Sequence, residues 1–158
     1  MKAPKFSYVR ADSVEHALEL LDKHGDDARI LAGGQSLMPT LNMRLSQPEI
    51  LIDINRLNEL KGISLDGDTV VIGALTRHVE VLNSDIVSAH LPLVTEAMPY
   101  VAHVAIRNRG TIGGSIALSD PAAEMPACAL ALGATLVVQN SGGKREIPAE
   151  QVFHGLYE

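Results

Sequence analysis

Two short glycine-rich segments are the residues of this sequence best suited to chemistry. The first glycine segment, residues 32–37 (AGGQSL), lies between a short apolar run and an expected helix, and the second, residues 111–115 (TIGGS), follows a pair of arginines. Paired glycines let backbone N–H groups approach an anion closely, and the first turn of a helix adds positive potential. Taken alone, each segment is better described as a tight turn that needs positive φ. Together, and each with a hydroxyl side chain, they favour a pyrophosphate held from two sides.

Neither segment matches a common nucleotide-binding loop. No Gly-Lys-Ser/Thr follows either glycine pair, which excludes a Walker A loop, and the GxGxxG fingerprint of a Rossmann domain is absent from both segments. The anion site that we expect is therefore of another kind.

Charged residues surround the second glycine segment. Asp120 precedes Pro121, an arrangement typical of a helix cap and first turn, and Glu124 lies one helical turn further on. Its carboxylate could accept hydrogen bonds from ribose hydroxyls. Arg107 and Arg109 precede the segment, and they either support the anion electrostatically or are simply solvated.

No other group of residues has the spacing of a catalytic or metal site. The six histidines show no HExxH or similar ligand spacing, and no Gly-x-Ser-x-Gly nucleophile elbow is present. Cys128 is the single cysteine, so this chain has no internal disulfide and no cysteine-ligated cluster. We therefore nominate no acid–base catalytic residue and no metal ligand.

The composition is that of a globular chain rather than a disordered one. Of its 158 residues 46% are hydrophobic and 20% are charged, and the formal net charge is −6. This charge, and aromatic residues at only 3%, argue against a nucleic acid partner.

The longest uncharged apolar stretch, about residues 127–138, is shorter than the ~20 residues of a membrane span. The single cysteine and the lack of a secretory signal predict a cytoplasmic protein.

Strands and helices are expected to alternate before residue 55. Apolar residues from Val14 to Leu21 follow i, i+3, i+4, i+7 spacing, which indicates an amphipathic helix. The expected elements are a strand at 6–9, a helix with a capping box at Asp12 and Glu15 that Gly25 ends, a buried strand at 29–32, a helix at 35–44 and a strand at 49–54. Strand, glycine turn, short helix and strand form a βαβ unit, so we expect parallel strands.

The pattern changes after about residue 56. Asp66-Gly67-Asp68 lies between two apolar runs and predicts a hairpin. The other expected elements are helices at 77–88 and 93–103 with interruptions around Pro92 and Pro99, a glycine-containing loop at 109–115, a helix at 121–132, and a second hairpin formed by 135–138 and 145–147. We therefore expect an α+β fold with a small βαβ lobe, residues 1–55, and a larger α+β lobe, residues 56–158.

The two glycine segments and their surroundings resemble one known family. AGGQSL after a strand, and RNRGTIGGS followed by ALSDPAAEMPA and ALGATL, resemble the FAD-binding medium subunit of molybdenum hydroxylases. That family includes aerobic carbon monoxide dehydrogenase and the flavin domain of xanthine dehydrogenase. The resemblance extends from KFSYVR to FHGLYE, which is essentially the whole chain.

The resemblance implies a two-lobed FAD-binding domain of the vanillyl-alcohol-oxidase (PCMH) type, with FAD between the lobes. The first segment would surround the pyrophosphate with main-chain amides, and the second would close on it from the other lobe. The implied cofactor-binding residues are Ala32, Gly33, Gly34, Gln35, Ser36, Leu37, Val101, Thr111, Ile112, Gly113, Gly114, Ser115 and Glu124. The family often has Asn where this chain has Ser115, a shorter donor. We expect the family's C-terminal domain to be absent from this chain.

The resemblance also implies an oxidoreductase subunit that relays electrons. A large partner subunit would carry the molybdenum cofactor, and a small partner subunit would carry [2Fe-2S] clusters that reduce the FAD. An external acceptor, NAD or a quinone, would then take the electrons. Two alternatives stay open: a stand-alone flavoprotein oxidoreductase of the same fold, and a non-enzymatic binding or assembly domain whose glycine turns are purely structural.

Overall fold

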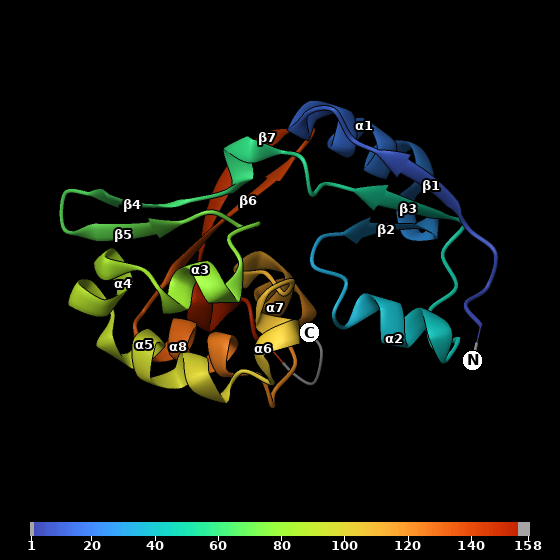
Figure 1. The fold of residues 1–158 in the computed structure, drawn as a ribbon. Coiled ribbons are helices and arrows are strands. Elements are labelled where there is room, and N and C mark those ends of the chain that lie inside the picture. Colours follow the sequence, from blue (N-terminus) through green and yellow to red (C-terminus); the bar gives the residue numbers. More distant parts are fainter. Residues whose placement is uncertain (1, 155–158) are drawn as a thin grey trace.

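The computed structural model describes residues 2–154 of the chain. Figure 1 shows the elements before residue 55, in blue and cyan, on one side of the molecule, and most later elements on the other. The expected second lobe extends to Glu158, so residues 155–158 of it lie outside the described residues.

A parallel three-stranded sheet forms within the first third of the chain. β3 (Ile50–Asp53) lies between β1 (Ser7–Arg10) and β2 (Ala28–Leu31), and both neighbours run parallel to it. All of β3 is buried, as expected for an apolar central strand. The parallel strands confirm the prediction of a βαβ unit. The prediction that β2 is buried was wrong at Arg29 and Ile30, which are exposed because β2 is an edge strand.

Two helices accompany this sheet. α1 (Val14–His24) packs on it through Ala17, Leu20 and Leu21, and Gly25 ends α1 with φ +51, as predicted. The expected capping box was wrong, because the Ser13 hydroxyl accepts the hydrogen bond from the His16 amide. α2 (Leu37–Asn42) is shorter than the predicted helix at 35–44 and lies below β2 in Figure 1.

Short helices and two antiparallel hairpins form the rest of the described chain. The hairpins are β4 (Ile63–Asp66) with β5 (Thr69–Ile72), and β6 (Thr135–Asn140) with β7 (Gly143–Pro148), and both confirm the predicted hairpins. The helices are α3 (His78–Leu82), α4 (Asp85–His90), α5 (Pro92–Ala97), α6 (Val104–Arg107), α7 (Ile112–Leu118) and α8 (Glu124–Ala131). The 3₁₀ turns are η1 (Gly25–Asp27), η2 (Asn58–Leu60), η3 (Met98–Tyr100) and η4 (Ala149–Gln151).

The predicted helices of this part were too long. The predicted helix at 77–88 is divided in two, because Ser84 accepts a hydrogen bond from the Val87 amide and begins α4. The helix predicted at 93–103 ends at Ala97, which confirms the interruption expected around Pro99, a residue with no N–H to continue the helix. The helix expected from Pro121 begins at Glu124, because Asp120 accepts from the Ala122 amide in a turn before the helix.

Aliphatic side chains fill the core of this second part. Its buried cluster consists of Val81, Val87, Val94, Met98, Val101, Met125 and Cys128. This agrees with a chain that has few aromatic residues. Within residues 2–154, no helix has both the length and the apolar character needed to cross a bilayer.

Candidate functional site

The first glycine segment forms the connection between β2 and α2. Gly33 is buried, and Gly34 has φ +71, a backbone conformation that side chains disfavour. The Gly34 carbonyl accepts from the Met38 amide, and the Gly33 carbonyl accepts from the Gln35 side-chain amide at 3.0 Å. The local carbonyl oxygens are thus engaged.

The backbone N–H groups of this segment are not engaged. Within the described chain, no residue accepts a hydrogen bond from the N–H groups of residues 33–37. Successive free amides in a turn form a concave donor surface that attracts anions. This arrangement is the strongest chemical feature of the site.

The second glycine segment differs, because most of its amides are already bonded. The Ile112 and Gly113 amides donate to the carbonyls of Thr76 and Ala74, at 3.0 and 2.8 Å. The Gly114 and Ser115 amides donate to the hydroxyl and carbonyl oxygens of Thr111, which caps α7. The predicted loop at 109–115 was therefore wrong from Ile112 onward, because the Thr111 cap starts a helix there.

Glycine is required in this second segment for close packing. A Cβ atom at Gly113 would lie 2.6 Å from the Ala74 Cβ, and one at Gly114 would lie 2.8 Å from the Thr111 hydroxyl oxygen. Among the described residues, neither the Thr111 amide nor the Ser115 hydroxyl has a hydrogen-bond acceptor. These two groups are the donors that the segment can still offer to a ligand.

The fold brings Gly33 of the first segment into direct contact with Arg109 and Gly110, the residues just before the second segment. A Cβ atom at Gly33 would lie 2.3 Å from the Arg109 carbonyl oxygen and 2.9 Å from the Gly110 Cα. Gly33 and Gly110 are both buried at this contact. The first segment thus lies against the two residues that precede the second segment, and the joint action of the two segments at one site stays a prediction.

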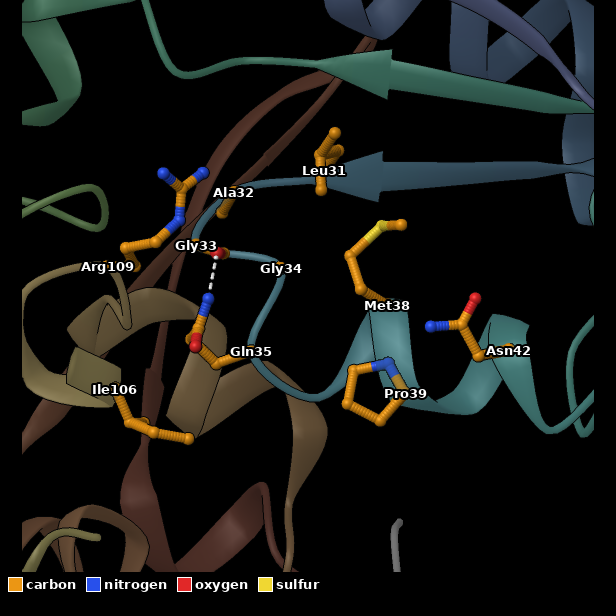
Figure 2. A pocket seen from close by; sticks show the side chains of 10 residues that line it. All are labelled: Leu31, Ala32, Gly33, Gly34, Gln35, Met38, Pro39, Asn42, Ile106 and Arg109. Atoms are coloured by element: carbon orange, nitrogen blue, oxygen red, sulfur yellow. Dashed lines mark hydrogen bonds between the residues drawn. The ribbon is translucent and has the colours of Figure 1, made fainter. Parts of the chain in front are cut away.

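An open cavity of about 540 Å³ adjoins this contact. Figure 2 shows that residues 32–35 of the first segment, α2 and the two residues Ile106 and Arg109 surround it, whereas the predicted residues Ser36 and Leu37 do not line it. The lining residues are Leu31, Ala32, Gly33, Gly34, Gln35, Met38, Pro39, Asn42, Ile106 and Arg109. The cavity combines apolar side chains with free amides and one cation, as ligand sites commonly do.

The two arginines before the second segment have different roles. Arg107 donates from one guanidinium nitrogen to the carbonyls of Pro99, Val101 and Ala102, at 2.9–3.1 Å, so it holds the loop before α6. The Arg109 side chain is exposed at the cavity, and within the described chain it has no hydrogen-bond or ion-pair partner. Of the two, Arg109 is the one placed to attract an anion.

Two polar side chains that the sequence analysis did not predict, Arg77 and Asn55, bind the backbone beside the contact of Gly33 with Arg109. Arg77 donates to the Asn55 side-chain oxygen at 2.6 Å and to the Arg109 carbonyl oxygen. The Asn55 side-chain amide donates to the carbonyls of Ala32, at 2.8 Å, and Leu31, at 3.2 Å, and to Asp53 at 2.8 Å. One signal for Asn55 was available, because polar residues just after a parallel strand commonly face the ligand edge of the sheet.

Burial, hydrogen bonds and nearby charges shift the pKa values of Asp53 and Arg77. Burial pushes the pKa of Asp53 upward, but hydrogen bonds from Tyr8 and Asn55 and the charge of Arg10 outweigh it, so the pKa lies below its ordinary value. Burial, and then the nearby Arg109 charge, lower the pKa of the Arg77 guanidinium. Asp53 is therefore held as a carboxylate.

Other residues predicted for the site lie outside the cavity. Val101 is only 9% exposed and packs in the apolar core, and Glu124 is the first residue of α8. Neither they nor residues 111–115 line the cavity. Among the described residues, no three His, Cys, Asp or Glu side chains gather to hold a metal ion.

The comparisons with known proteins agree on one family. The family model described as the FAD binding domain in molybdopterin dehydrogenase matches residues 4–158. The chain is 53% identical to the 6-hydroxypseudooxynicotine dehydrogenase complex subunit alpha of Paenarthrobacter nicotinovorans, over 97% of this chain and 52% of that protein. It is 47% identical to the carbon monoxide dehydrogenase medium chain of Hydrogenophaga pseudoflava, over 99% of this chain and 55% of that protein.

Solved structures show the same similarity. Carbon monoxide dehydrogenase from Hydrogenophaga pseudoflava, in a form that lacks the Mo-pyranopterin moiety, superimposes with a TM-score of 0.98 at 47% identity. Quinoline 2-oxidoreductase from Pseudomonas putida 86 gives a TM-score of 0.97 at 39% identity. Each match covers all of this chain and 55% of the other. The chain thus spans about half the length of the relatives that it matches.

Proposed function

The chain belongs to the family of FAD-binding domains in molybdopterin dehydrogenases, and we propose that it binds FAD with its pyrophosphate on the first glycine segment. In this proposal it is the flavin-binding part of an electron-transfer subunit in a molybdenum hydroxylase. It would stand between [2Fe-2S] clusters of a small partner subunit and an external acceptor, NAD or a quinone. The molybdenum cofactor would be carried by a large partner subunit.

The free amides of residues 33–37 are the observation that supports this proposal most directly. A pyrophosphate carries acceptor oxygens and negative charge, and these amides are donors without acceptors in the described chain. The exposed Arg109 guanidinium at the same cavity adds positive charge. The residues present therefore fit a dinucleotide phosphate group.

The remaining site residues are proposed in supporting roles. We propose that the Thr111 amide and the Ser115 hydroxyl donate from the second segment, while Gly113 and Gly114 permit its close packing. Glu124 is proposed to accept from ribose hydroxyls, and Val101 to pack near the flavin. When bound, FAD supplies the redox chemistry, and the protein positions it.

The two-lobed description remains part of the proposal. We propose that residues 1–55 and 56–158 are the two lobes of a vanillyl-alcohol-oxidase (PCMH) type domain, with FAD between them. The contact of Gly33 with Arg109 lies between these two ranges and supports that division. Partner subunits are suggested by the names of relatives, which are a complex subunit and medium chains. The cytoplasmic setting stays a prediction from the single cysteine.

Titration of the purified, flavin-free chain with FAD tests the proposal. We expect saturable quenching of flavin fluorescence, with FMN binding at least about tenfold more weakly because it lacks the pyrophosphate and adenosine. ADP should compete with FAD, since it carries the pyrophosphate. A chain that binds neither FAD nor ADP contradicts the proposal and favours purely structural glycine turns.

A further inference from the structure

Arg77 and Asn55 connect the two parts of the chain that meet at the cavity. Arg77 follows β5 and precedes α3, and Asn55 follows β3. Two different guanidinium nitrogens are used, one toward the Asn55 side-chain oxygen at 2.6 Å and the other toward the Arg109 carbonyl oxygen. We call this pair the Asn55–Arg77 link.

The link ends at the peptide group before Gly33 of the first segment and at the peptide group before Gly110, just ahead of the second segment. Asn55 binds the carbonyl of Ala32, which directly precedes Gly33, and Arg77 binds the carbonyl of Arg109, which directly precedes Gly110. In a planar trans peptide the carbonyl and the following N–H point in opposite directions. Fixing the Ala32 carbonyl toward Asn55 therefore directs the Gly33 N–H away from Asn55, as a free donor.

Few other hydrogen bonds join these two parts. Within residues 2–154, the bond from Arg77 to Asn55 is the only one that joins residues up to 55 with residues beyond 60. The Asn55 amide is itself fully oriented, because it donates to Ala32, Leu31 and Asp53. On one side of the link, Asn55 is held by hydrogen bonds to the ends of β2 and β3, and on the other side Arg77 is the single cation that binds it.

We propose that Asn55 and Arg77 are positioning residues that set the distance between the two glycine segments, and thereby the preference of the site for a ligand that touches both. This inference rests on the proposed FAD function. A ligand held by the first segment alone, such as ADP, does not depend on that distance. FAD, which also reaches the second segment, does depend on it.

Arginine is needed because its two terminal nitrogens bind two acceptors at once. Lysine at position 77 supplies one charged group that cannot span both oxygens in the same way. Aspartate at position 55 keeps an oxygen for Arg77 but loses the donor to the Ala32 and Leu31 carbonyls. Each half of the link can therefore be broken separately.

The test compares FAD and ADP affinities of the full chain and its variants Arg77→Met and Arg77→Lys. Arg145→Met is the matched control, since Arg145 is exposed on β7, far along the chain from the link. We expect Arg77→Met to weaken FAD binding about tenfold or more, while ADP affinity changes less than about threefold. Arg77→Lys should recover only part of the FAD affinity.

Folding is monitored in parallel by thermal unfolding. Should Arg77→Met fail to fold, Arg77→Lys carries the same test, because it keeps the charge at position 77 but cannot bind both oxygens in the same way. Equal loss of FAD and ADP affinity, or no loss of either in a folded variant, overturns the positioning role. Absence of FAD binding by the unmodified chain would instead overturn the proposed function from which this inference starts.

Discussion

Gly33 and Arg109 meet so closely that a β-carbon at position 33 would lie 2.3 Å from the Arg109 carbonyl oxygen. The same oxygen accepts a hydrogen bond from Arg77. One backbone atom therefore determines both where the first glycine segment can lie and where the Asn55–Arg77 link ends. A side chain at position 33 must move one of these groups.

Gly33→Ala should therefore separate the two segments. We expect the free energy of unfolding to fall by about 1–3 kcal/mol, the usual cost of inserting a methyl group into a packed contact. FAD affinity should fall at least about tenfold, since the free amides move relative to the second segment. Chemical denaturation and FAD titration measure the two effects.

Gly142→Ala is the matched control for this change. Its φ is not in the left-handed region, and a β-carbon there would meet only the Asn140 side chain at 3.2 Å. It lies in the β6–β7 hairpin, outside the cavity lining. Unchanged FAD affinity in folded Gly33→Ala would show that the contact does not matter for binding.

Local signals in the sequence were sufficient for the parallel strands and both hairpins. Alternating and apolar runs predicted β1 and β3, and Asp66-Gly67-Asp68 predicted the first hairpin at its observed place. Where a helix depends on one capping hydroxyl, the prediction failed, as at Ser84 and Thr111. A Ser or Thr hydroxyl can bond the nearby backbone in turns as well as at helix starts, so its presence in a sequence does not by itself predict a cap.

The site was predicted only in its backbone part. Paired glycines are visible in a sequence, so the two segments could be named, and the fold places Gly33 against Arg109 and Gly110, just before the second segment. Asn55 carried one signal, its place just after a parallel strand, but it pairs with Arg77 22 positions away, and Arg77 pairs with Arg109 32 positions away. No local pattern encodes such a pairing. The bonded amides of Ile112 and Gly113 were missed for the same reason.

Arg109→Ala should weaken FAD binding mainly through charge. The side chain is exposed at the cavity, so we expect a loss of about fivefold at low salt, the size typical of one solvated ion pair. The difference from the unmodified chain should shrink as salt is added, because dissolved ions screen the attraction between the Arg109 guanidinium and the negatively charged ligand. Titrations at several salt concentrations measure it.

Arg109→Lys and Arg145→Ala complete this comparison. Lysine at position 109 retains the charge, so its FAD affinity should lie near that of the unmodified chain. Arg145→Ala removes an equal charge from the exposed strand β7 and should change little. If both alanine variants lose affinity equally, a general effect of net charge is responsible, and the local role of Arg109 is wrong.

Asp53 should make stability depend on pH in the acid range. Its pKa lies below the ordinary 3.8, so the unfolded chain binds this proton more readily than the folded chain. The contribution of the carboxylate is complete above the ordinary value and is lost as the pH falls through the lower, folded pKa. Asp53→Asn should remove it, so the stability difference between the two proteins is constant above about pH 5 and shrinks below. Urea unfolding of both proteins at a series of pH values above and below about pH 5 measures this stability difference. A difference that grows on acidification contradicts the argument.

His78 should produce a second, separate pH effect. The side chain is 4% exposed beside Gly110, and within the described chain its Nδ1 has no hydrogen-bond partner. Burial, and then the charge of Arg107, lower its pKa below the ordinary 6.5. The unfolded chain therefore takes up a proton first, and stability decreases as the pH falls below 6.5 toward the folded pKa.

His78→Leu should remove this dependence. Because leucine leaves no buried nitrogen without a partner, stability at pH 7.5 and above should be equal or higher, and the decline below about pH 6.5 should flatten. His90→Gln, at an exposed histidine that ends α4, is the control and should keep the decline. Denaturation curves of the three proteins across this range decide the matter: a decline that persists in His78→Leu assigns the titration to another group.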